Sequence, residues 1–380
     1  MAKREAQFNP KGSSSFKSVL KNRVVQGVLL AGMLLGLPLL GLVVSGQPVS
    51  PFLQFPPETR LVDHAPFSWT VFVLLAMGIF AALLPFLVWC ILSTPSRVSF
   101  KRAGQSFPWW GTAGLVLIAA AWFLGWNRFD WFAWGQLYTF PFLWFGYILL
   151  INGLTHKRSG QCMLLGQPIR FGLLFPVSAV FWWFFEYLNR FVENWAYLQV
   201  ERFSALEYVI YASVCFSTVL PAVLGTRDFL ATFPFFDRFF TDVLPLRPAR
   251  PRIWSFALLC LSGAGLAVIG AWPDQLFPLL WVSPLVIIAA SQTLLGEDHV
   301  FTSVTTGDWS PVVRAALAAL ICGVFWEMWN LYSLAKWVYS IPYVQRFHVF
   351  EMPILGYAGY LPFGLECAII GEWVLGRERR

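Results

Sequence analysis

Two acids in apolar, aromatic stretches are the strongest candidates for chemistry in this chain. Glu186 and Glu327 are each followed three residues later by an asparagine, Asn189 or Asn330. On a helix this spacing places the acid and the amide on one face. A carboxyl group among apolar side chains holds its proton more strongly than in water and can serve as a general acid. We predict that the two acids are catalytic and that the two amides bind and orient the substrate.

A Trp-x-Tyr motif and a further acid follow each of these candidates. Aromatic faces stabilise a developing positive charge, so acids and aromatic walls inside a membrane could protonate and rearrange an isoprenoid. The same groups could instead bind a cation or a lipid amine. The sequence predicts that these residues line a substrate pocket: Trp195, Tyr197, Glu207, Trp337, Tyr339 and Glu351.

Structural roles compete with these functional ones. Glu207 and Glu351 are expected at helix starts, where an acid stabilises the N-terminus. The amides could be hydrogen-bond partners between helices, and the Trp and Tyr side chains could belong to the aromatic belt of a membrane protein. If the neighbouring bases Arg190 and Lys336 pair with the two apolar acids, an ion pair explains those acids without any function.

Glu366 lies inside another apolar stretch and has no acidic counterpart in the first half of the chain, where Gly225 is the nearest equivalent. An acid at that depth in a membrane is costly unless it is protonated, paired or hydrated. We therefore predict a catalytic role for Glu366 as well.

The motifs form part of a longer repeat. The Phe-Pro-x-x-Trp segment at 140–144 returns at 277–281, and the other motifs return at a similar offset of about 140 residues. We predict two four-helix repeats, 108–225 and 253–380, joined by a cytoplasmic linker at 226–252. An even number of helices gives both copies the same orientation, with a pseudo-twofold axis along the membrane normal.

Composition predicts the fold class. Hydrophobic residues make up 57% of the chain and charged residues only 12%, which is outside the range of soluble proteins. Apolar stretches of about 20 residues are long enough to cross a membrane. We expect an all-α, polytopic transmembrane bundle with ten spans, at 24–46, 67–93, 108–126, 132–153, 170–189, 205–225, 253–272, 275–295, 311–333 and 353–374.

The remaining N-terminal residues divide into a basic, polar tail (1–23), predicted to be disordered, and a two-span addition (24–107). With ten alternating spans, most of the 27 Lys and Arg residues lie on the side of the N-terminus. This asymmetry predicts that both termini are cytoplasmic. The net charge of +7 then reflects topology and anionic lipids, and no nucleic-acid partner is expected.

Metal and cofactor chemistry is not indicated. The six cysteines and four histidines are dispersed, and there is no Cys-x-x-Cys, so we expect no cofactor, metal or disulfide framework. We see no nucleotide-binding loop and no Ser-His-Asp set. The expected partners are membrane lipids and a lipid-like small molecule.

The chain resembles an uncharacterised family of bacterial multi-spanning membrane proteins through Phe325-Trp326-Glu327-x-x-Asn330, Trp337-x-Tyr339, Phe350-Glu351-x-Pro353 and Leu361-Pro362-x-x-x-Glu366. More remotely, the order of acid, Trp-x-aromatic and Pro with Glu is similar to the small-subunit-type (heterodimeric) lycopene cyclases, which are membrane-embedded and built from helical repeats. The Pro-x-Glu-Glu motif of those cyclases is replaced here by Pro362 and, four residues later, Glu366. The second resemblance implies an isoprenoid as the substrate class.

Three functions follow from the sequence. The first is a membrane enzyme acting on an isoprenoid or another lipid, in the cytoplasmic (inner) membrane of a bacterium. The second is a transporter or flippase for a lipid-like or cationic solute, with the crevice between the repeats as its path. The third is a structural or assembly protein whose acids are ion-paired.

Overall fold

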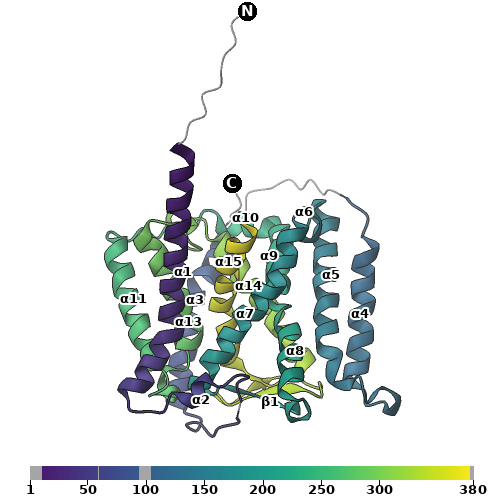
Figure 1. Cartoon of the computed structure of the whole chain (residues 1–380). Helices are drawn as coiled ribbons and strands as arrows, with labels where there is room; N and C mark the ends of the chain where they lie inside the picture. Colours follow the sequence, from purple (N-terminus) through teal and green to yellow (C-terminus); the bar gives the residue numbers. More distant parts are fainter. Residues whose placement is uncertain (1–10, 59, 94–103, 377–380) are drawn as a thin grey trace, which may run out of the picture.

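The protein is a bundle of long helices that stand side by side (Figure 1). The computed structural model describes residues 11–58, 60–93 and 104–376, with the side chains of 11–25 left out of the description. The long helices are α1 (Lys11–Val44), α3 (Trp69–Leu92), α4 (Trp109–Trp126), α5 (Thr139–Ser159), α7 (Pro168–Val192), α8 (Ala205–Phe216), α9 (Val219–Ala231), α11 (Pro251–Ala267), α13 (Leu279–Leu295), α14 (Ser310–Asn330) and α15 (Tyr360–Leu375).

Shorter elements lie in the connections. The short helices are α2 (Ser50–Leu53), α6 (Met163–Gly166), α10 (Pro234–Phe240) and α12 (Pro273–Leu276), with 3-10 turns η1 (Asp130–Phe132), η2 (Gln136–Tyr138), η3 (Val200–Arg202), η4 (Thr302–Thr306) and η5 (Ile354–Gly359). The strands are β1 (Trp195–Leu198), β2 (Lys336–Tyr339), β3 (His348–Val349) and β4 (Met352–Pro353).

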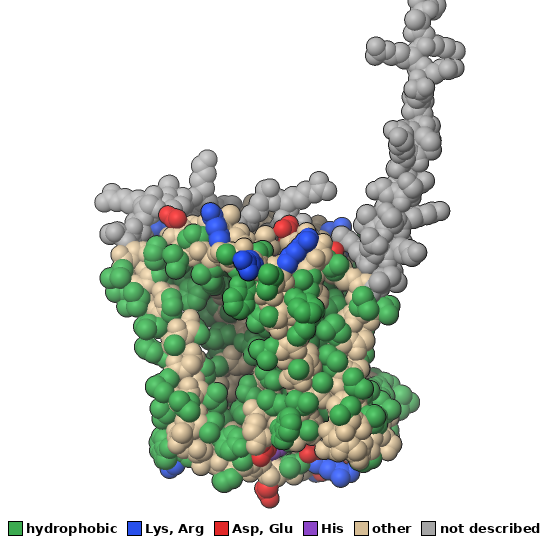
Figure 2. All heavy atoms as spheres, turned by 90° about the vertical axis from the view of Figure 1, so that its left-hand side faces the viewer, with side chains coloured by type: hydrophobic (Ala, Val, Ile, Leu, Met, Phe, Trp, Pro, Cys, Tyr) green, Lys and Arg blue, Asp and Glu red, His purple; other side chains and the backbone are tan. Residues whose placement is uncertain are grey.

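This is a helical, multi-pass membrane protein. In the described part of the chain, eight helical segments are long and apolar enough to span a membrane: Gln26–Val44, Trp69–Leu92, Trp109–Trp126, Gln136–Ser159, Pro168–Val192, Ala205–Ala231, Ser310–Asn330 and Ile354–Leu375. Helices α11 and α13 are apolar too, but each has only 17 residues. The face turned to the viewer in Figure 2 is apolar over its middle, carries charged side chains at its upper and lower edges, and is hollowed.

Two predicted boundaries differ from the structure, and one predicted span is interrupted. Helix α1 begins at Lys11, so 11–23 is helical where disorder was expected, while residues 1–10 lie outside the described residues. The span predicted at 205–225 lies within the membrane-spanning segment Ala205–Ala231. This segment is interrupted between α8 and α9, where the Thr218 hydroxyl bonds the Cys215 carbonyl at 2.7 Å and Pro221 contributes no N–H. Helix α9 then continues to Ala231, so the expected linker at 226–252 starts as a helix.

The first and the last long helix have their terminal ends on the same side of the bundle. The N-terminal end of α1 and the C-terminal end of α15 are at the top of Figure 1, and β1 lies at the bottom. There β1 pairs antiparallel with β2, in a register that joins Trp195 to Tyr339 and Tyr197 to Trp337. The two Trp-x-Tyr motifs, far apart in sequence, therefore become neighbours.

Helices α4 and α5 approach each other closely because glycines face one another across their contact. A Cβ atom added at Gly114 would lie 2.6 Å from the Gly146 carbonyl oxygen, and one added at Gly146 would lie 2.8 Å from the Gly114 carbonyl oxygen. Small residues commonly allow this approach between membrane helices, where packing replaces the hydrophobic effect.

This contact gives a test of the fold. We expect Gly114→Leu to push α4 away from α5 and to cost about 1–3 kcal/mol through overpacking, seen as a lower unfolding temperature in detergent. The matched control is Gly36→Leu in α1, where an added Cβ meets nothing within 4 Å. Equal unfolding temperatures for the two variants would contradict the close approach of α4 and α5.

Candidate functional site

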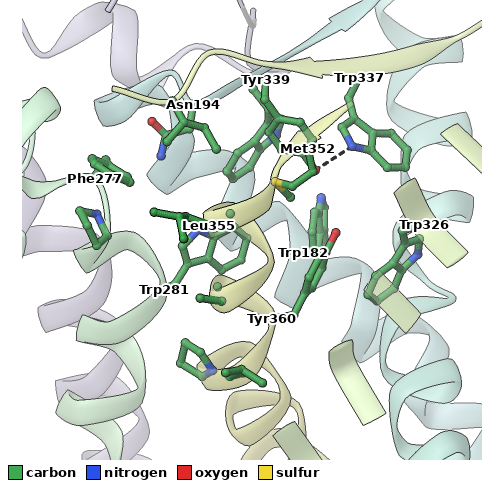
Figure 3. Close-up of a pocket in the computed structure, with 18 of the residues that line it drawn as sticks. Trp182, Asn194, Phe277, Trp281, Trp326, Trp337, Tyr339, Met352, Leu355 and Tyr360 are labelled. Carbon is green, nitrogen blue, oxygen red and sulfur yellow. Dashed lines mark hydrogen bonds between the residues drawn. The ribbon is translucent and has the colours of Figure 1, made fainter. Parts of the chain in front are cut away.

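A cavity of about 640 Å³ lies beside the β1–β2 ladder (Figure 3). Its volume is typical of small-molecule sites. Its wall comes from helices α3, α5, α7, α8, α9, α13, α14 and α15, the turns η3 and η5, and the strands β1, β2 and β4. None of the described residues that line it is charged, and most are aromatic or aliphatic. The cavity therefore suits an apolar molecule rather than a hydrated ion.

All four members of the Trp-x-Tyr motifs line this cavity: Trp195, Tyr197, Trp337 and Tyr339. Figure 3 shows Trp337 and Tyr339 descending from the strand, while Tyr360 rises from α15 below. Burial is the main cause that raises the pKa of the Tyr197 and Tyr339 phenols, and the neighbouring carboxyl groups add to it. Both phenols are therefore protonated near neutral pH. Binding of a substrate by these four residues stays a prediction.

Glu186 lies behind the aromatic wall on the first-half side. It is fully buried, and its Oε1 atom accepts hydrogen bonds from Trp182 Nε1 (2.9 Å), Trp195 Nε1 (3.2 Å) and the Tyr197 hydroxyl (2.6 Å). These three donors all come from cavity-lining residues. The acid is thus one hydrogen bond away from the cavity.

Glu327 occupies the corresponding position on the other side. It is also fully buried, and its Oε1 atom accepts from the hydroxyls of Tyr339 (2.7 Å) and Tyr360 (2.8 Å). Both phenols line the cavity. Within the described chain, Oε2 of Glu327 and Oε2 of Glu186 are buried without a hydrogen-bond partner.

The alternative in which the neighbouring base forms a salt bridge with each acid does not hold for the described residues. Arg190 donates instead to the Phe52 carbonyl, and Lys336 forms a salt bridge with Glu351. The side chains of Glu186 and Glu327 are therefore held by neutral donors. The simplest structural explanation of the two acids, pairing with the neighbouring base, does not apply.

Asn189 and Asn330 hold the strands in place and do not line the cavity. Asn189 donates to the Trp195 carbonyl at 2.9 Å and accepts from the Asn194 amide at 2.9 Å. Asn330 donates to the Trp337 carbonyl at 2.7 Å and accepts from the Trp337 amide at 2.9 Å. Their amide groups bond main-chain atoms of the β1–β2 segments, and a contact of either amide with substrate stays a prediction.

Two further acids that were expected in the pocket lie outside it. Glu207 is exposed and forms a capping box with Ser204 at the start of α8, which is the structural role the sequence allowed. Glu351 lies in the turn before β4 and pairs with Lys336, so it is not at a helix start. Neither lines the cavity.

Glu366 is buried, with 1% of its surface exposed, but it does not join the cavity wall. Its carboxyl group lies beside the main chain of Leu285 in α13. Neither of its oxygens makes a standard hydrogen bond to the described residues. Leu361 and Pro362, about one helical turn earlier on α15, do line the cavity. The structure therefore places Glu366 outside the cavity wall, and its catalytic role stays a prediction.

Sequence reasoning missed Trp182 and Tyr360, which both line the cavity and bond an acid. Trp182 precedes Glu186 by one helical turn, so the i, i+4 spacing could have identified it. Tyr360 lies 33 residues from Glu327 along the chain. Only the packing of α14 on α15 brings this pair together.

The site contains no evident metal centre: among the described residues, no three His, Cys, Asp or Glu side chains gather closely enough to hold an ion. No family model, curated protein or solved structure matches the chain.

The asparagine contacts give a second test. We expect Asn330→Ala to lower stability by about 1–3 kcal/mol, because the main-chain groups of Trp337 lose their partners in a partly buried site. Asn127→Ala is the control, since the exposed Asn127 makes a single side-chain bond, to the Phe123 carbonyl at the end of α4. Thermal unfolding in detergent and proteolysis of 331–359 would report the difference. A loss no larger than that of the control would argue against the role of Asn330 in holding β2.

Proposed function

We propose that this protein binds an isoprenoid or another membrane lipid in the cavity and acts on it as an enzyme. The observation that carries the proposal is the bonding of two buried carboxyl groups to phenols that line an uncharged, aromatic cavity. A lipid chain fits the apolar wall, and the phenols connect it to the acids.

The chemistry would be proton transfer to a carbon–carbon double bond. The phenol hydrogen of Tyr339 or Tyr360 adds to one carbon, and the π electron pair forms the new C–H bond. Glu327 returns a proton to the phenol oxygen, and the adjacent carbon becomes a cation that aromatic faces stabilise. Loss of a proton from the rearranged cation to the carboxylate restores the acid. The net reaction is an isomerisation or cyclisation that needs no oxidant.

Helix α3 supports a ligand that comes from the bilayer. It has no buried residue, yet Leu75, Gly78 and Ile79 line the cavity. Its lower end packs through Phe72 against Phe347 at 5.6 Å, and its upper end through Phe86 against Trp309 at 5.0 Å. The middle of α3 is thus a thin wall between cavity and lipid, held mainly at its ends.

The symmetry of the strands supports the two parallel repeats. In the β1–β2 pair Ala196 lies opposite Val338, and the Trp of each motif lies opposite the Tyr of the other motif. A twofold axis between equivalent segments requires this register. Equivalent residues of both repeats also line the cavity: Phe140 with Phe277, Trp195 with Trp337, and Tyr197 with Tyr339. We propose ten spans, since 17 residues of helix extend about 26 Å. Both termini would then be cytoplasmic, in a bacterial inner membrane.

Transport is the second candidate. Glu366 favours it, because a buried, unpaired acid beyond the cavity is typical of a proton or ion path. A hydrated cation fits the cavity poorly, however, because the acids are covered by aromatic rings. Transfer of a lipid between the two leaflets is the form of transport that suits this apolar wall.

Lipid analysis tests the catalytic proposal. We expect Glu327→Gln, and to a lesser degree Glu186→Gln, to cause a lipid precursor to accumulate in membranes that carry the variant, because the amide cannot return the proton. Glu207→Gln is the control, since Gln can also complete a capping box. The measurement is mass spectrometry of total lipid extracts. Unchanged lipid species with an altered leaflet distribution would favour transport, and no change of either kind would reject both functions.

A variant of α3 tests the route from the bilayer. An added Cβ at Gly78 meets nothing within 4 Å, so Gly78→Leu should fold normally and narrow the cavity at α3. We expect several-fold less lipid to co-purify with Gly78→Leu than with the control Gly36→Leu, as measured by mass spectrometry per mole of protein. Equal amounts would contradict the role of α3 as the cavity wall towards lipid.

A further inference from the structure

Tyr339, Tyr360 and Glu327 form a cluster rich in hydrogen-bond acceptors. Tyr339 donates to Glu327 Oε1 at 2.7 Å and accepts from Trp337 Nε1 at 2.8 Å, while Tyr360 donates to the same Oε1 at 2.8 Å. With the proton that Glu327 carries in the proposed function, four hydrogens are shared among two phenol oxygens and a carboxyl group. Each phenol oxygen has two lone pairs, and a protonated carboxyl group still has acceptor capacity on its oxygens. The cluster has more acceptors than donors.

A molecule bound in the cavity can bring a further hydrogen-bond donor to this cluster. Both phenols and Trp337 line the cavity, and Tyr360 stacks on Trp326 at 5.9 Å. The neighbouring lining residues Met352 and Leu355 have no N–H or O–H in their side chains. A buried acceptor without a donor is costly, so a bound molecule that supplied one would be favoured here.

The first half of the cavity does not repeat this arrangement. Oε1 of Glu186 already accepts three donors, two of them indole N–H groups. The first half also has the phenols of Tyr208 and Tyr211 and the acceptor Asn194 Oδ1 on the cavity wall. Two phenols bond one acid at the Tyr339–Tyr360 end, and we place the polar end of the ligand there.

We propose that the ligand is a neutral lipid alcohol, whose hydroxyl donates to the phenol oxygen of Tyr360 or Tyr339 and whose hydrocarbon extends towards α3 and the first half. This deepens the proposed function and rests on it. An ammonium group suits the site less well, because it brings three donors and a full charge into a cavity lined by no charged side chain. A single O–H matches the phenol lone pairs that remain.

Three probes with the same C20 isoprenoid chain test this proposal: geranylgeraniol, its methyl ether and geranylgeranylamine. Binding to the purified full chain in nanodiscs can be measured by displacement of a fluorescent polyene. We expect the wild type to prefer the alcohol over the ether by about tenfold, the value of roughly one hydrogen bond. Tyr360→Phe should remove most of this preference, and thermal unfolding in detergent shows whether the variant folds.

Tyr211→Phe is the matched control, because Tyr211 lines the first-half side of the cavity. It should keep the preference for the alcohol. Equal binding of alcohol and ether by the wild type would overturn the hydroxyl proposal and leave lipid binding intact. Stronger binding of the amine would overturn it in favour of a cationic head. Binding of none of the three would contradict the proposed function itself.

Discussion

The structure depends on the need of two buried carboxyl groups for hydrogen-bond donors. Glu186 and Glu327 lie inside an apolar bundle, where an acid without donors is strongly destabilising. Their donors are indole and phenol groups, which combine a large apolar body with one polar atom. Because these donors must face the acids, their rings lie between the acids and the cavity and form part of its wall. Aliphatic residues of α3 and of other elements complete the wall.

The β1–β2 ladder makes this arrangement possible. It brings two aromatic motifs from distant parts of the chain into contact, and the asparagine at each preceding helix end bonds the main chain of its own strand. Each strand is thereby fixed to the helix that carries the acid. The amides of Asn189 and Asn330 consequently act on the site through the main chain.

The two halves share a plan but differ in the groups that meet the cavity. The acid of the first half is held by two indoles and one phenol, and the acid of the second half by two phenols. A phenol can exchange its proton with a carboxyl group and a bound molecule, whereas an indole N–H is only a donor. This difference favours the second half for proton transfer and the first half for holding an apolar chain.

The sequence by itself determined the helical membrane architecture, because long apolar stretches are stable only where lipid replaces water. It also identified Glu186 and Glu327 as buried acids, because their neighbours along the chain are apolar and aromatic. It could not separate a pocket role for Glu207 and Glu351 from a structural one, because the same spacing suits a capping box or a partly buried ion pair. Only the tertiary structure decided that Tyr360 bonds Glu327 and that α3 closes the cavity. Both depend on which helices pack together, and residue spacing within one helix carries no information about that choice.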